Sequence, residues 1–194
     1  VEWKEQGFEE DNYGSLIETV LSAYLQGIFP MADEDGSIYW YAPDPRAIIP
    51  ISTYKPAKSL RPILNKGLFE IRFNTAFEDV IRACAQPRTA EDGVWISEDI
   101  IHEAWLDGKL AGGLYGVAMG KVFFGESMFH RVPNASKVAF HYLIEHLKDR
   151  GFGLLDTQFM NDNVKRFGAI EIPKEEFLLL LEQHVSLERE FLPK

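Results

Sequence analysis

The middle of the chain carries hydrophobic and polar positions in an order that predicts one mixed α/β unit. Two β-prone runs, 110–118 and 121–129, flank a Met-Gly pair that suits a tight hairpin turn. Apolar residues then recur at helical spacing over 138–150, a stretch that a glycine ends. The apolar run 152–158 follows and indicates a buried strand. We expect the rest of the chain to be arranged around this unit.

The same patterns predict shorter elements on both sides of the unit. Helices are expected from 15 or 18 to 26, at 59–65, 75–85, 98–103 and 163–167, and from 173 or 174 to 184. Short strands are expected at 38–41, 48–51, 69–73 and 170–172. The sequence has no internal repeat, so a globular mixture of helices and strands is predicted.

Size and composition narrow the class of protein. The chain has 194 residues, of which 46% are hydrophobic, enough for a sizeable core in one large domain or two small ones. The single cysteine, Cys84, excludes an intramolecular disulfide and a multi-cysteine metal site. It is compatible with a reducing compartment, and no apolar run reaches the roughly 18 residues of a membrane span. We therefore expect a cytoplasmic protein without a membrane partner.

Charge gives two opposed indications. The formal net charge of −10 disfavours a nucleic-acid partner. Residues 55–72, however, carry five basic side chains against a single acidic one. Such a basic stretch is compatible with contact to phosphates, and it is equally compatible with a solvated helix face. On charge alone, both interpretations stay open.

Several well-known chemistries lack their motifs here. The sequence has no GxxxxGK[ST] loop, no GxGxxG after a strand and no GxSxG elbow. Its five histidines show no paired metal-ligand spacing. We therefore expect neither a metal nor an organic cofactor.

Polar residues at the end of the buried run 152–158 are the first candidates for chemistry. Asp156 and Gln158 would share one face of a strand, and would offer a proton acceptor beside a neutral donor and acceptor. The alternative is that Asp156 caps a turn and Gln158 is merely exposed. Glu126 stands in an aromatic run, where a carboxylate needs a partner. It could bind a cationic substrate group or pair with an internal Arg or Lys.

Five short strings, in a fixed order, resemble the bacterial leucyl/phenylalanyl-tRNA–protein transferases. They are AYLQGIFP at 23–30, WYAPDPR at 40–46, FGESMF at 124–129, NASK at 134–137 and DTQ at 156–158. The resemblance runs from about residue 16 to residue 173. It implies an enzyme that takes Leu or Phe, with Met as a further candidate, from aminoacyl-tRNA. The acceptor would be the α-amine of a protein beginning with Arg or Lys, which is thereby marked for N-end-rule degradation.

The resemblance also implies an architecture. A small N-terminal α/β domain, expected at 1–50, would precede an acetyltransferase-like (GNAT-type) mixed-sheet domain at 51–194. The fold class is then α+β, and the protein is expected to be a monomer. The strand, turn, strand, helix and strand order described above agrees with this architecture.

Site roles follow from the resemblance residue by residue. Asp156 and Gln158 match the catalytic pair, in which the carboxamide assists attack of the α-amine and the carboxylate holds and helps deprotonate it. Glu126 matches a site glutamate suited to a cationic N-terminal side chain. Five apolar residues match the family positions that line the pocket for the transferred side chain: Leu114, Phe123, Phe140, Leu143 and Leu155. Alternatively, these residues only pack in the hydrophobic core.

Further matches concern the tRNA. Trp95 matches an aromatic residue that stacks on the terminal adenosine. Met31 stands where the family often has a second Trp of that clamp. Lys58, Arg61 and Lys66 match the positions at which the family has basic residues facing the acceptor stem of the tRNA.

One departure from the family pattern affects the predicted core. About fourteen residues present in the family are absent between Glu103 and Ala104. A true deletion would remove a core strand and a tyrosine at the rim of the site. The alternative is that the protein contains these residues as a disordered loop that is missing from the sequence. An intact mass of 22.2 kDa would indicate a true deletion.

Two other functions compete with this one. An acetyl-CoA-dependent N-acetyltransferase needs a glycine-rich pyrophosphate loop before its central helix, and residues 131–136 contain no glycine. A non-catalytic module that binds tRNA or protein N-termini is the other alternative. Binding of acetyl-CoA would identify the first, and absence of turnover the second.

Overall fold

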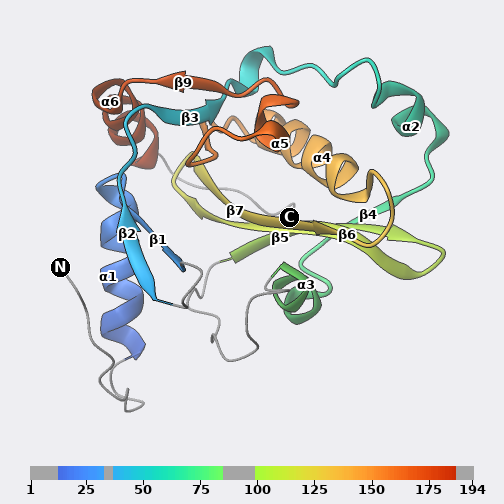
Figure 1. The fold of residues 1–194 in the computed structure, drawn as a ribbon, viewed down its shortest axis with the longest axis horizontal. Helices are drawn as coiled ribbons and strands as arrows, with labels where there is room; N and C mark the ends of the chain where they lie inside the picture. Colours follow the sequence, from blue (N-terminus) through green and yellow to red (C-terminus); the bar gives the residue numbers. More distant parts are fainter. Residues whose placement is uncertain (1–12, 33–36, 85–98, 187–194) are drawn as a thin grey trace.

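A seven-stranded mixed sheet forms the centre of the protein (Figure 1). The structure is a computed structural model, which describes residues 13–32, 37–84 and 99–186. In spatial order the strands are β4 (Glu70–Phe73), β5 (Asp99–Leu106), β6 (Lys109–Met119), β7 (Val122–His130), β8 (Leu154–Asp156), β3 (Arg46–Ile49) and β9 (Ile170–Ile172). Every neighbouring pair is antiparallel except β7 and β8, which are parallel.

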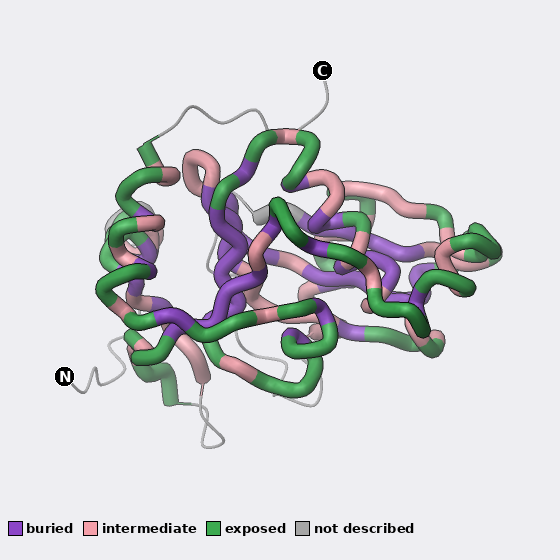
Figure 2. Tube along the Cα trace, turned by 90° about the horizontal axis from the view of Figure 1, so that it is seen from above, coloured by how far each residue is buried: buried purple, intermediate pink, exposed green. Residues whose placement is uncertain are grey.

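Helices cover both faces of the sheet. Consecutive side chains of a strand point to opposite faces, so Phe123 packs with α4 (Ala135–Asp149) and Phe124 packs with α1 (Tyr13–Leu25) and α6 (Lys174–Val185). Each of these phenylalanines is fully buried, which stabilises the fold by about 1.5–3 kcal/mol per side chain. The buried stretches follow the central strands in Figure 2.

Shorter elements complete the structure. The helix α3 (Phe77–Cys84) packs on the face opposite α4, as Figure 1 shows. The remaining helices are the 3₁₀ turn η2 (Ile51–Thr53), α2 (Arg61–Lys66) and α5 (Asp162–Lys165). The strands β1 (Phe29–Ala32) and β2 (Ile38–Tyr41) form a separate antiparallel pair. None of the described helices is long and apolar enough to cross a membrane.

The parallel strands β7 and β8 diverge, and we call this point the strand fork. Their last paired residues are Phe124 and Asp156. Beyond them β7 continues to His130 against β6, whereas β8 ends. The chain after β8 turns toward β3, where the backbone N–H of Thr157 donates to the carbonyl of Ala47 at 3.0 Å. Side chains from both strands therefore meet beside the part of β7 that, among the described residues, has no strand paired on its β8 side.

Most elements predicted from the sequence are confirmed. The hairpin is β6 and β7, the helix at 138–150 is α4, and the strands at 38–41, 69–73 and 170–172 are β2, β4 and β9. The strand β1 was not predicted, because Pro30 lies inside it and proline lowers strand propensity. The strand predicted at 152–158 is shorter, and ends at Asp156.

The helix predicted at 98–103 is wrong where the structure describes it. Residues 99–106 form β5, which pairs with β4 on one side and β6 on the other. Sheet hydrogen bonding on both edges overrides the local helical pattern. The junction between Glu103 and Ala104, where a true deletion was expected to remove a core strand, lies inside the continuous strand β5. Its register is irregular between Ala104 and Trp105, beside the junction itself.

Candidate active site

Five polar side chains from distant parts of the sequence meet at the strand fork. We call Tyr24 of α1, Arg46 of β3, Glu126 of β7, Asp156 of β8 and the following Gln158 the polar cluster. Each strand of the fork contributes one carboxylate, and the other members bind these two groups. The polar cluster is the structure's main candidate for chemistry.

Asp156 is fully committed to partners inside the protein. Its two carboxylate oxygens accept hydrogen bonds from Nε and Nη2 of Arg46 at 2.9 and 2.6 Å. The side chains of Arg46 and Asp156 are 1% and 0% exposed. A bidentate, charge-assisted pair of this kind is among the strongest hydrogen-bonded arrangements in proteins. Because no part of this carboxylate reaches the surface, it acts on its surroundings by holding other groups.

Arg46 is held on every side. Its Nη1 donates to the carbonyl of Gly27 at 2.9 Å. The rings of Phe29 and Phe177 lie 4.6 and 4.5 Å from its guanidinium carbon and supply cation–π contacts. The guanidinium is thus fixed by β1, α6, β8 and the turn that follows α1.

Gln158 has an unusual backbone conformation. Its φ angle is 64°, in the left-handed region that non-glycine residues rarely adopt. Its N–H donates to Asp156 Oδ1 at 2.9 Å, and its carbonyl accepts from the N–H of Ala47 at 3.2 Å. Because the strand ends at Asp156, the prediction that the two side chains share a strand face is wrong. Asp156 instead faces Arg46, and the Gln158 carboxamide donates to Glu126 Oε1 at 3.0 Å.

Glu126 has a carboxyl group that can change its charge near neutral pH. Its Oε1 accepts hydrogen bonds from the Tyr24 hydroxyl at 2.6 Å and from Gln158, so within the described part of the chain its hydrogen-bond partners are neither Arg nor Lys. Burial raises the pKa of Glu126 to about 7, although both hydrogen bonds act to lower it. Burial and the neighbouring Glu126 raise the pKa of Tyr24, which therefore serves as a neutral donor.

The polar cluster therefore combines three kinds of group. A buried ion pair supplies rigidity, a carboxamide presents a neutral oxygen, and a half-buried carboxyl group can hold a cation or a proton. This set suits a reaction in which an amine is oriented and loses a proton. The five residues of the polar cluster include no histidine, cysteine or serine that could act as a nucleophile.

The predicted pocket residues lie together beside the polar cluster's strands. All five belong to the core cluster under α4, and none is more than 3% exposed; they are Leu114, Phe123, Phe140, Leu143 and Leu155. Their packing is that of a protein interior, so their use as a pocket stays a prediction.

The predicted tRNA contacts are distributed differently. Lys58, Arg61 and Lys66 are all exposed on α2 and the turn before it. Arg72, from the same basic stretch, forms two hydrogen bonds of 2.9 Å with the Glu70 carboxylate. Met31 is half-buried in β1, opposite Tyr39. Trp95 lies outside the described residues.

Sequence reasoning missed two members of the polar cluster. Tyr24 and Arg46 both lie inside motifs that carried the family resemblance, but no role was inferred for either. A signal for Arg46 did exist, since it is a lone cation at the start of the apolar run Ala47–Ile49. A cation in a buried strand requires a buried anion, and Asp156 is such an anion in another apolar strand.

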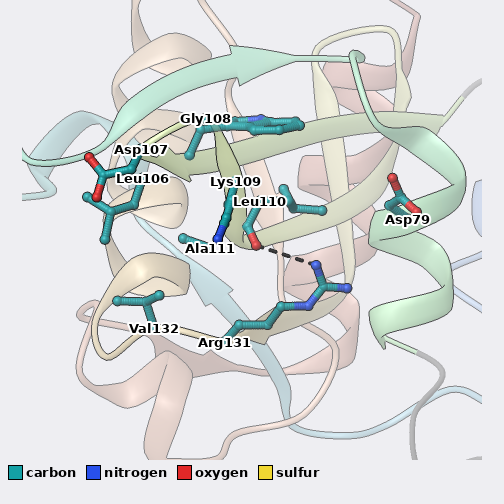
Figure 3. A pocket seen from close by; sticks show the side chains of 10 residues that line it. Asp79, Leu106, Asp107, Gly108, Lys109, Leu110, Ala111, Arg131 and Val132 are labelled. Atoms are coloured by element: carbon teal, nitrogen blue, oxygen red, sulfur yellow. Dashed lines mark hydrogen bonds between the residues drawn. The ribbon is translucent and has the colours of Figure 1, made fainter.

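A cavity of about 630 Å³ lies elsewhere, beside the β5–β6 hairpin (Figure 3). Its lining includes Lys109, Arg131, Asp79 and Asp107, whose formal charges balance. None of the residues that line this cavity belongs to the polar cluster, so the polar cluster remains the candidate active site.

Comparisons with known proteins support the resemblance seen in the sequence. Residues 48–182 match the family model described as leucyl/phenylalanyl-tRNA protein transferase, and residues 16–44 match the model of its N-terminal domain. A protein named leucyl/phenylalanyl-tRNA–protein transferase from Chlorobaculum parvum is 49% identical to this chain over 185 residues. The alignment covers 88% of this chain and 95% of the relative. The relative in Gloeobacter violaceus is 49% identical over 190 residues, covering 90% and 96%.

A solved structure shares the fold at low sequence identity. It is the structure of L-PGS from Bacillus licheniformis, with a TM-score of 0.50, 11% identity, and coverage of 95% of this chain and 100% of that one. At this identity the likeness concerns only the fold. It supports the arrangement of a mixed sheet with helices on both faces.

Proposed function

The chain belongs to the leucyl/phenylalanyl-tRNA protein transferase family, and we propose that it transfers Leu or Phe from aminoacyl-tRNA to proteins that begin with Arg or Lys. The family is one of aminoacyltransferases, so the protein is an enzyme of that class. Met is a further candidate for the transferred residue. The modified protein would then carry a new N-terminal residue that marks it for N-end-rule degradation.

The observation that carries the proposal is the contact between Gln158 and Glu126 at the strand fork. In the reaction the α-amine nitrogen attacks the ester carbonyl of aminoacyl-tRNA and a C–N bond forms. The ester C–O bond breaks, and the proton lost by the amine passes to the released ribose hydroxyl. The Gln158 carboxamide oxygen can accept an amine N–H and orient the lone pair toward the ester.

The two carboxylates take different parts in this proposal. Asp156 is buried and paired with Arg46, so we assign it the positioning of Gln158 rather than direct contact with the amine. Glu126 is only half-buried, and its Oε2 accepts no hydrogen bond from the described residues. It would bind the cationic side chain of an N-terminal Arg or Lys.

The apolar residues under α4 would select the transferred side chain. Leu114, Phe123 and Leu155 lie on the strands beside the strand fork, and Phe140 and Leu143 face them from α4. A pocket opened between them would admit Leu or Phe. It would discriminate against β-branched side chains by about 1–3 kcal/mol.

The tRNA would be bound through its phosphates and its terminal base. Lys58, Arg61 and Lys66 are exposed and close together in sequence, which suits contact with the acceptor stem. Trp95 and Met31 are the proposed contacts of the terminal adenosine. We propose no metal or organic cofactor, because the attack on an activated ester needs only orientation and proton transfer.

We further propose an acetyltransferase-like catalytic domain preceded by a small N-terminal domain. The divergence of the parallel strands β7 and β8, with α4 between them in sequence, supports this assignment. Because β3 pairs with β8 and β9 in the central sheet, we place the boundary between the two parts before residue 46, and not after residue 50 as predicted from the sequence.

Transfer of labelled Leu from Leu-tRNA to a short peptide tests the proposal. We expect label on a peptide beginning with Arg and none on the same peptide beginning with Ala. Val-tRNA serves as the control for the donor side, and we expect it to react poorly. Equal labelling of both peptides would contradict the acceptor rule, and no labelling by folded protein would contradict the function.

A further inference from the structure

Arg46 is buried within the polar cluster, and its contacts hold other groups of the protein. Resting on the function proposed above, we propose that Arg46 is a positioning residue for aminoacyl transfer: it fixes the Asp156 carboxylate, which in turn sets the orientation of the Gln158 carboxamide. Neither Arg46 nor this chain of contacts was assigned a role by sequence reasoning.

The guanidinium is fixed in position and in rotation. Two of its donors bind the two oxygens of Asp156, at 2.9 and 2.6 Å, and a third binds the Gly27 carbonyl at 2.9 Å. The rings of Phe29 and Phe177 hold it by cation–π contact. These contacts leave the carboxylate of Asp156 one orientation, because a planar fork bound to two oxygens prevents rotation about the carboxyl bond.

The orientation of Asp156 passes directly to Gln158. Oδ1 of Asp156 accepts from both Arg46 Nε and the Gln158 backbone N–H, each at 2.9 Å. The N–H bond holds Gln158 at a φ of 64°, a conformation that needs support from its surroundings. From this backbone the carboxamide reaches Glu126 Oε1 at 3.0 Å. A shift of the guanidinium therefore moves the group that orients the amine.

Lysine cannot replace these functions. It would keep the positive charge against Asp156, but a single ammonium on a flexible stem cannot bind both carboxylate oxygens and the Gly27 carbonyl in one plane. Arg46→Lys is therefore a variant that keeps the charge and loses the geometry. Arg72→Lys is the matched control, because Arg72 also binds a carboxylate in bidentate fashion and lies 4.4 Å from the Trp105 ring, away from the polar cluster.

A double-mutant cycle tests whether Arg46 acts through Gln158. Arg46→Lys should lower kcat at least about tenfold while the KM for aminoacyl-tRNA changes less than about twofold. In a Gln158→Asn background the same substitution should lower kcat less than about twofold. Arg72→Lys should leave kcat unchanged in both backgrounds. Equal losses from Arg46→Lys in the two backgrounds would overturn the proposal, since Arg46 would then act independently of Gln158.

A measurement on the protein alone separates this proposal from the proposed function. The hydrogen bond from Gln158 lowers the pKa of Glu126, which is about 7, so displacing the carboxamide should raise the titration midpoint of the Glu126 carboxyl in ¹³C NMR. Arg46→Lys and Gln158→Ala should raise it to a similar extent, and Arg72→Lys should not. An unchanged midpoint in folded Arg46→Lys would overturn the positioning role, whether or not the protein transfers Leu.

A second variant covers the case in which Arg46→Lys does not fold. Phe177→Leu removes one of the two rings that hold the guanidinium and retains an apolar side chain. It should lower kcat in the wild-type background and leave kcat unchanged in the Gln158→Asn background. The same loss in both backgrounds would overturn the proposal.

Discussion

At the level of single residues, the polar cluster contains two carboxyl groups in different surroundings. Asp156 and Arg46 are buried and pair with each other, whereas Glu126 is half-buried and retains an oxygen without a partner among the described residues. Both oxygens of Asp156 are bound by Arg46, whereas the pKa of Glu126, raised to about 7 by burial, lets that carboxyl gain or lose a proton near neutral pH. Two acidic residues that look equivalent in the sequence therefore have different expected effects when they are changed.

The charge of Glu126 should give acceptor binding a pH dependence. Burial raises the pKa of Glu126 to about 7, so below that pH the carboxyl is largely protonated and cannot attract a cationic side chain. The KM for an Arg-initiated peptide should therefore fall about five- to tenfold as the pH rises from about 6 to about 8. Steady-state kinetics across this range measures it.

Two variants make this pH prediction specific. Glu126→Gln should raise the KM and make it independent of pH. Tyr24→Phe removes a hydroxyl donor that lowers the pKa of Glu126, so the midpoint of the pH profile should move upward. A wild-type KM that does not vary between about pH 6 and about pH 8 would contradict the proposed contact between Glu126 and the cationic N-terminal side chain.

Asp156 should affect stability as well as catalysis. Asp156→Ala leaves the Arg46 guanidinium buried without its anion, which typically costs about 3–5 kcal/mol of unfolding free energy. Gln158→Ala removes one hydrogen bond to Glu126 Oε1, which retains its bond from Tyr24, so we expect a smaller loss of about 0.5–1.5 kcal/mol. Urea denaturation followed by circular dichroism compares the two, with Glu70→Gln as the control on an exposed ion pair. Equal stability of Asp156→Ala and Gln158→Ala would contradict the buried pair.

At the level of elements, β5 joins the central sheet to α3 through one buried side chain. Glu103 of β5 is fully buried and accepts hydrogen bonds from the backbone N–H groups of Thr75 and Ala76, both at 2.7 Å, at the start of α3. It also accepts from the Thr75 hydroxyl and from the Trp105 indole. The strand is thereby joined to the helix that packs beneath it.

The contacts of Glu103 provide a test of β5. Glu103→Ala should lower the unfolding free energy by about 2–4 kcal/mol, because several buried donors lose their acceptor. Glu78→Ala on the exposed face of α3 is the matched control, since its partner Arg82 is also exposed. Equal effects of the two substitutions on the urea midpoint would contradict the position of Glu103 inside the sheet.

The elements also mark what the sequence could predict. Two β-prone runs around a Met-Gly turn were sufficient for β6 and β7, and helical spacing was sufficient for α4, because these elements are long. The pattern at 99–103 is short and was assigned to a helix, and its pairing with two strands depends on residues far away in sequence. Local periodicity carries no information about such pairing.

The candidate site shows the same limit. Asp156, Gln158 and Glu126 stood out because polar residues are conspicuous in apolar runs. The partners Tyr24 and Arg46 lie 102 and 110 positions away from the groups they bind, and spacing alone could not connect them. The sequence therefore pointed to the candidate groups, and the fold was needed to show their partners and their burial.

At the level of the whole molecule, an acidic protein is proposed to bind an acidic partner. The net charge of −10 opposes the approach of tRNA, so a local basic surface must supply the attraction. Replacing Lys58, Arg61 and Lys66 by Gln should weaken tRNA binding and reduce the slope of log K against log salt by about 2. Filter binding at several salt concentrations measures the slope.

The control for this prediction removes the same number of positive charges from other helices. Arg82, Lys148 and Lys165 are exposed on other helices, and replacing them by Gln alters the net charge equally. We expect this variant to retain most of the salt slope. Equal slopes for the two triple variants would remove α2 from the proposed tRNA interface.

The central claim is that the polar cluster at the strand fork performs the transfer, and the single-turnover rate of Gln158→Ala tests it most directly. Leu-tRNA and an Arg-initiated peptide would be mixed with excess enzyme, with Gln183→Ala, an exposed glutamine of α6, as the control. We expect Gln158→Ala to lower the rate by about 100-fold or more with Leu-tRNA affinity retained, and Gln183→Ala to leave both unchanged. A normal transfer rate in folded Gln158→Ala would contradict the account and place the reaction elsewhere in the protein.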